Sequence, residues 1–131
     1  MADLVFVTGL SHAPGLTGWL DQAPENEQVS LTDGFNKLGE LLRAAKPDLI
    51  IGIANDHVLN MPLHDLHDFC VGTAESWSGP ADWFQDWINV APYTVQGASG
   101  IAKTLFDGLS ARGFNTTSKT ELLFDDNWSV P

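Results

Sequence analysis

The sequence predicts an α/β fold, with a central, mostly parallel or mixed sheet flanked by helices. Short apolar runs rich in β-branched residues alternate with two longer segments whose apolar residues recur at helical spacing. The resulting order of strand, helix, strand, helix and strand is typical of this class. Hydrophobic residues make up 44% of the 131 positions and charged residues 18%, which is enough apolar material for one packed core.

The amino-terminal half contains two predicted strands and one predicted helix. The apolar run at 4–9 ends in a glycine, as a buried strand often does, and residues 11–16 follow as a turn. Residues 31–45 form the helix, because one apolar face recurs at helical spacing and Pro47 then ends it. The continuous apolar run at 49–54 predicts a strand buried on both faces.

The second half continues the alternation of strands and helices. We expect a short strand at 69–72, an amphipathic helix over 98–109 that ends near Gly113, and a last strand at 121–124. Between them, the aromatic segment from Trp77 to Tyr93 either walls a pocket for a ring substrate or covers the core or a subunit contact. We favour the second interpretation.

Charge and cysteine content exclude several classes of function. The formal net charge of −11 disfavours nucleic acids and anionic membrane surfaces as partners. Seven acids but no lysine or arginine lie between Lys46 and Lys103, which favours either a bound cation or a solubilising surface. Cys70, the only cysteine, occupies a buried strand position rather than a nucleophilic one. With neither a signal peptide nor a membrane-spanning run apparent, we expect a cytoplasmic protein.

Three polar segments follow predicted strands: Ser11-His12, Asn55-Asp56-His57 and Asp125-Asp126-Asn127. In open α/β sheets, ligands bind beyond the carboxyl ends of the strands. Two histidines and a carboxylate brought together there would form a facial iron(II) site, whereas separately they would be hydrogen-bonded loop residues. His64 and His67 have helical metal-ligand spacing, but nearby Pro62 places them in an exposed turn.

These segments resemble three motifs of the class III extradiol ring-cleavage dioxygenases, specifically of their catalytic (β) subunits, such as that of protocatechuate 4,5-dioxygenase. Ser11-His-Ala-Pro is similar to the opening Ser-His-x-Pro motif of that family. Asn55-Asp-His resembles its second motif, and residues 124–131 resemble a third that usually contains Asp-His-Gly. Together the three motifs cover nearly the whole sequence.

The resemblance implies that His12 and His57 are iron(II) ligands and that Asp56 orients its surroundings. The third ligand of the family is a glutamate far downstream of the third motif. We therefore expect residues 1–131 to be the amino-terminal portion of one extradiol dioxygenase-like catalytic domain, an incomplete domain. Asp126 stands where the family has a histidine, and we assign it to substrate binding or proton transfer.

The implied reaction is cleavage of a catecholic ring by dioxygen, with an aromatic diol as substrate and a homo-oligomer or a small helical subunit as possible assemblies. Two alternatives stay open. The chain is a noncatalytic fragment or subunit that retains the fold, or it is a metal-dependent hydrolase in which Asp125 or Asp126 is the third ligand.

Overall fold

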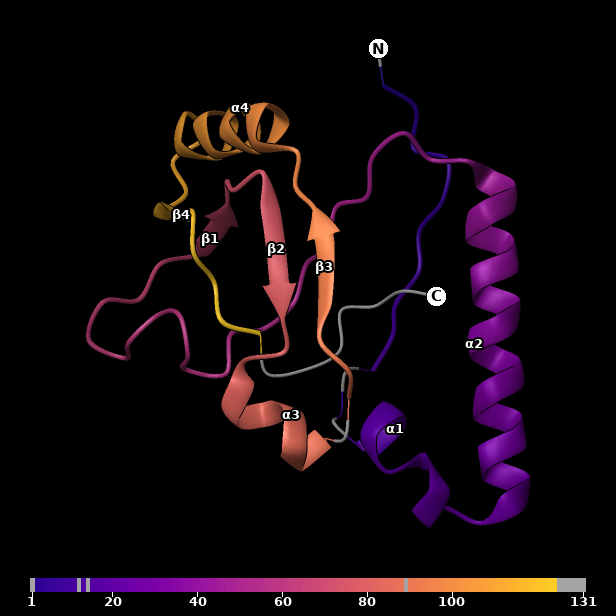
Figure 1. Cartoon of the computed structure of the whole chain (residues 1–131). Helices are drawn as coiled ribbons and strands as arrows, with labels where there is room; N and C mark the ends of the chain where they lie inside the picture. The colour runs from indigo at the N-terminus through magenta and orange to yellow at the C-terminus, as the bar shows by residue number, and fades with distance from the viewer. Residues whose placement is uncertain (1, 12, 14, 89, 125–131) are drawn as a thin grey trace.

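The computed structural model describes residues 2–11, 13, 15–88 and 90–124, and it contains helices together with two pairs of strands (Figure 1). The helical elements are α1 (Gly15–Gly18), the 3₁₀ turn η1 (Leu20–Gln22), α2 (Glu25–Ala45), α3 (Asp82–Ile88) and α4 (Ser99–Ser110). The strands are β1 (Phe69–Gly72), β2 (Ser76–Gly79), β3 (Tyr93–Gln96) and β4 (Thr116–Lys119).

One strand pair is parallel and the other antiparallel. β1 and β4 run parallel, with Phe69 opposite Thr116 and Gly72 opposite Lys119. β2 and β3 run antiparallel, with Ser76 opposite Gln96. α4 packs against both β1 and β4, as a crossover helix between parallel strands does (Figure 1). This mixture of helices with parallel and antiparallel strands confirms the predicted α/β class.

The tightest packing lies around β1 and β2. Val71 in β1 is buried, with 8% of its surface exposed. A Cβ added to Gly72 would lie 2.7 Å from the indole ring of Trp77, so only glycine permits this approach. On its other side Trp77 meets the ring of Phe124 edge to face, with 6.0 Å between ring centroids. Residues from β1, β2 and the segment after β4 therefore form one packed cluster.

Both predicted helices and the predicted strand at 69–72 are confirmed. α2 begins earlier than its apolar face indicated, because Glu25 and Glu27 extend its first turn, where acidic side chains favour the helix dipole. It ends where Lys46 adopts a left-handed backbone conformation, with φ 48°, directly before Pro47. No helix within the described residues is both long and apolar enough to cross a bilayer.

The predicted strands at 4–9 and 49–54 are wrong. Both segments are extended in shape but belong to no ladder, and their side chains are not buried: Leu4 is 85% exposed and Ile53 84%. An apolar run becomes a strand only where a neighbouring strand satisfies its backbone N–H and C=O groups. In the described part of the chain the strands pair only as β1 with β4 and β2 with β3.

The predicted last strand at 121–124 is also wrong, for a more local reason. The backbone N–H and C=O of Leu123 bond to the side-chain amide of Asn60 instead of to a neighbouring strand. Conversely, β2, β3 and β4 were not predicted, because short runs such as Thr116-Thr-Ser-Lys show no apolar alternation. Tertiary pairing, rather than local pattern, determines these strands.

Cys70 lies in β1 and is half-buried, which confirms its assignment to a strand. Burial raises the pKa of its thiol, the charge of Asp56 adds to that effect, and Lys119 partly opposes it. We therefore predict that Cys70 reacts with iodoacetamide more slowly than a peptide thiol at pH 8, and that its rate levels off at a higher pH. Reaction in native protein as fast as in urea-unfolded protein would contradict this assignment.

Candidate functional site

Asp56 closes the loop that contains His57. Its carboxylate accepts hydrogen bonds from the backbone N–H groups of Asn60 and Met61, each at 3.0 Å, and from the side-chain amide of Asn60 at 2.9 Å. Aspartate side chains commonly stabilise turns through such bonds to backbone groups a few residues away. Because the acceptor precedes His57 and the donors follow it, the loop closes around the histidine. Asp56 therefore orders its own loop, and its orienting role beside a metal ligand stays a prediction.

The same bonds determine the protonation state of Asp56. Burial alone raises the pKa of its carboxyl, but hydrogen bonds from Met61, Asn60 and Leu59 outweigh burial and bring the pKa below its ordinary value. Asp56 is therefore an ionised acceptor whose two oxygens are already engaged by the loop. This arrangement suits an orienting residue better than a metal ligand.

The residue after His57 has an unusual backbone conformation. Val58 has φ 64°, in the left-handed region that β-branched residues rarely occupy. Such a conformation costs roughly 1–3 kcal/mol and persists only where the surroundings enforce it. Here the hydrogen bonds between Asp56 and Asn60 span Val58. Strain of this kind gathers at functional sites, so its position beside His57 supports a function for the loop.

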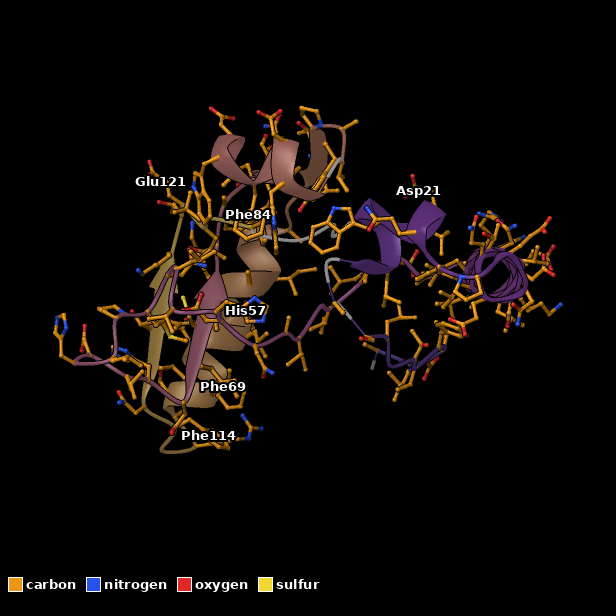
Figure 2. The ribbon with its side chains drawn as sticks, turned by 90° about the horizontal axis from the view of Figure 1, so that it is seen from below. Asp21, His57, Phe69, Phe84, Phe114 and Glu121 are labelled. Atoms are coloured by element: carbon orange, nitrogen blue, oxygen red, sulfur yellow. The ribbon has the colours of Figure 1, made fainter. Side chains whose placement is uncertain are left out.

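His57 itself is exposed at the surface of this loop. In the view from below it lies near the middle of the molecule, with Phe84 of α3 on one side and the Phe69–Phe114 pair on the other (Figure 2). An exposed imidazole on a closed, strained loop can meet a ligand while its backbone stays fixed. His64 is exposed in a turn closed by a hydrogen bond from the N–H of Asp65 to the carbonyl of Pro62, as predicted. His67 lies after this turn and is partly buried, so the predicted exposed turn does not extend to it.

Asn60 joins this loop to the segment that leads into the third motif. Its side-chain amide donates to the carbonyl of Leu123 at 3.0 Å and accepts from the N–H of Leu123 at 2.7 Å. The ammonium group of Lys119 donates to the backbone carbonyl of Asn60. The loop that follows the second motif and residue 123, which directly precedes the third motif, therefore lie side by side although they are more than 60 residues apart in sequence. Asp125 and Asp126 come directly after this contact but lie outside the described residues.

The first motif leads into α1, and His12 and Pro14 within it also lie outside the described residues. Trp19, just after α1, donates its indole N–H to the carbonyl of Trp87 in α3 at 2.9 Å. The two indole rings meet edge to face with 4.8 Å between centroids. Figure 1 shows α1 and α3 as neighbours at the same end of the molecule. Trp19 therefore anchors the segment that follows His12 on α3.

α3 and the residue directly before it contact segments that adjoin the first and third motifs. The backbone N–H of Ala81, directly before α3, donates to the carbonyl of Phe124 at 2.8 Å. Trp87, near the other end of the helix, receives Trp19. One helix thus contacts the segment after His12 and the segment before Asp125, and Asn60 connects the latter to the His57 loop. A continuous set of contacts links the described flanks of all three motifs.

The aromatic residues between Trp77 and Tyr93 have both of the roles that the sequence left open, because some cover the core and others line a cavity. Trp77 covers the core through Phe124, as we favoured. Trp83, which is 59% exposed, lines a cavity of about 460 Å³ together with Tyr93 and Leu123. This cavity lies beside the contact between Asn60 and Leu123, at the edge of the candidate site. Aromatic side chains therefore contribute both to packing and to the wall of a cavity.

Four of the seven acids between Lys46 and Lys103 accept structural hydrogen bonds. Asp56 binds its own loop, Asp68 accepts from the N–H of Asn115, Glu75 from the hydroxyl of Ser99 and Asp82 from the amide of Gln85. Within the described residues, no group of three His, Cys, Asp or Glu side chains could hold a metal. The acid-rich stretch therefore stabilises loops and helix ends more than it concentrates charge at one point.

Comparison with known families identifies the family of the chain. The family model described as the catalytic LigB subunit of aromatic ring-opening dioxygenase matches residues 7–129. The chain belongs to this family. Membership agrees with the resemblance of the three motifs and shows a relationship to aromatic ring-opening dioxygenases. No curated protein and no solved structure matches the chain. The matched range includes His12, His57 and the third motif up to Ser129.

Asn60 is the site residue that the sequence did not indicate. An asparagine three residues after a candidate histidine belongs to no ligand motif and resembles any polar loop residue. The only local signal was Asp56, because an aspartate followed four residues later by an asparagine is compatible with a side-chain-closed loop. The partner of Asn60 at position 123 depends on tertiary structure and leaves no pattern in the sequence.

We predict that Asp56→Ala destabilises the fold by about 1–2 kcal/mol, because it removes the acceptor of several N–H groups in a partly buried loop. Urea unfolding followed by circular dichroism measures the loss. Asp65→Ala, in the neighbouring exposed turn, is the matched control and is expected to change stability by less than about 0.5 kcal/mol. Equal effects of the two substitutions would show that the loop does not depend on Asp56.

Proposed function

We propose that this LigB-family chain takes part in iron(II)-dependent extradiol cleavage of a catecholic ring by dioxygen, with His12 and His57 as iron ligands. The observation that supports this most is the side-chain amide of Asn60, which joins the His57 loop to the segment before Asp125 and Asp126. The family match gives the class of reaction. We also propose that the chain is similar in function to the catalytic subunit of protocatechuate 4,5-dioxygenase.

The donor set fits iron(II). Two neutral imidazoles and one carboxylate form the facial arrangement that non-haem iron(II) oxygenases use, and it leaves coordination positions open. When bound, iron(II) supplies electron transfer between an aromatic diol and dioxygen. For the third ligand we propose a glutamate, as in the family. Asp125 or Asp126 in that position is the alternative that a metal-dependent hydrolase would use.

The protein side chains have separate tasks in this proposal. Asp56 stays ionised and keeps the His57 loop closed, so that the imidazole is presented with little reorganisation. Asp126, in place of the histidine usual in the family, accepts a hydrogen bond from a substrate hydroxyl and takes up its proton. The cavity lined by Trp83 and Tyr93 offers aromatic surface against which the substrate ring packs.

The proposed substrate is an aromatic diol, and the proposed setting is the breakdown of aromatic compounds in the cytoplasm. Assembly as a homo-oligomer or with a small helical subunit belongs to the same proposal. The net charge of −11 disfavours nucleic acids and anionic membranes as partners. A noncatalytic subunit that retains the fold is the competing function, and the experiment below separates the two.

We predict that protein from the complete reading frame, loaded anaerobically with iron(II), consumes oxygen when given members of a catechol panel. His12→Ala and His57→Ala should each lower the rate by at least about 100-fold, beyond the range for residues that only orient ligands. His64→Ala, which removes an exposed turn histidine, is the matched control and should retain the parental rate.

Two outcomes would contradict the proposal. Oxygen uptake that survives both His12→Ala and His57→Ala would remove these residues from the site. Stoichiometric zinc in protein purified without added metal, with no catechol-dependent oxygen uptake, would favour the hydrolase that uses Asp125 or Asp126.

A further inference from the structure

Asn60 uses all of its polar groups in the contacts around His57. Its backbone N–H and one side-chain N–H donate to Asp56, and the other side-chain N–H donates to the carbonyl of Leu123. Its side-chain oxygen accepts from the N–H of Leu123, and its backbone carbonyl accepts from Lys119. An asparagine side chain offers two donor hydrogens and one acceptor oxygen, and each has a partner here.

The two bonds to Leu123 imitate a pair of strands. In an antiparallel ladder, one residue exchanges an N–H and a C=O bond with its opposite residue. Here the side-chain amide of Asn60 takes the place of that opposite residue, with bonds of 3.0 and 2.7 Å. Two bonds from one planar group fix both the distance and the orientation of the His57 loop relative to residues 123 and 124.

The bonds of Asn60 to Leu123 affect His57 because Asn60 lies in the same closed loop. Asp56 and Asn60 bracket His57, and both ends of this short ring are bonded to each other. Val58, within the ring, keeps its left-handed conformation, with φ 64°. A shift of Asn60 therefore moves the backbone of His57 directly, because no flexible segment lies between them. Such closed geometry is what a metal-ligand loop requires.

We propose that Asn60 is a positioning residue, which holds the His57 loop at a fixed place relative to residue 123 and so tunes the affinity of the metal site. This inference rests on the proposed function of His57 as a ligand. Its action is indirect, since Asn60 reaches the site only through Asp56 and Leu123.

The most selective test is Asn60→Asp. The variant keeps the size and one acceptor oxygen of the side chain but loses both side-chain donors, and it places a second carboxylate next to Asp56 and the carbonyl of Leu123. Asn115→Asp is the matched control. It removes the same kind of bond, from a side-chain amide to the carbonyl of Leu66 at 3.2 Å, in a tie between distant segments that lies at the start of β4.

Cobalt(II) is the probe, because its visible absorption reports both binding and ligand geometry. We predict that Asn60→Asp, in protein from the complete reading frame, weakens cobalt(II) binding by about 10–100-fold and alters the absorption bands. Asn115→Asp should leave affinity and spectrum unchanged. Asn60→Ala, which loses the bonds without adding a charge, should also weaken binding, and it decides the question if the aspartate variant does not fold.

His57→Ala in the same titration separates the two claims. If His57→Ala abolishes the cobalt(II) spectrum while both Asn60 variants retain the parental affinity and bands, the positioning role is overturned and the ligand role of His57 survives. If His57→Ala binds cobalt(II) like the parent, the proposed function fails first, and the role of Asn60 fails with it.

Discussion

The arrangement of the candidate site depends on one constraint: the backbone of Leu123 must find hydrogen-bond partners, and the side chain of Asn60 provides them. A neighbouring strand would satisfy the same N–H and C=O groups, but it would not connect residue 123 to the loop that contains His57. An asparagine inside the His57 loop does both, since it completes the backbone bonds of residue 123 and is itself bound to Asp56. The loop and residue 123 therefore adopt one relative position.

α3 holds two further segments of the candidate site in place, the one that contains Trp19 and the one that contains Phe124. A helix of seven residues is too short to be stable alone, so its contacts with Trp19 and Phe124 stabilise the helix as much as they position those segments. The local acids follow a similar logic, because Asp56 and Asp82 each stabilise a short element from within. For Asp56, the N–H bonds that it accepts also bring the pKa of its carboxyl below the ordinary value.

Local pattern predicted the two long helices and one of the strands. α2 and α4 were predicted from helical spacing of apolar residues, and β1 from a short β-rich run. The runs at 4–9 and 49–54 have the same composition as strands but find no partner in the described part of the chain, so composition alone misassigned them. At the site, the motifs indicated His12, His57 and Asp126. The motifs did not indicate Asn60, because its role depends on a contact with a residue 63 positions away.

The central claim is that His12 and His57 share one iron ion, and X-ray absorption at the iron edge tests it most directly. In the iron(II)-loaded protein from the complete reading frame, we predict scattering from two imidazole rings bound at about 2 Å. His12→Ala and His57→Ala should each leave the scattering of one ring. A spectrum without imidazole scattering in the parent, or one unchanged in both variants, would contradict the account.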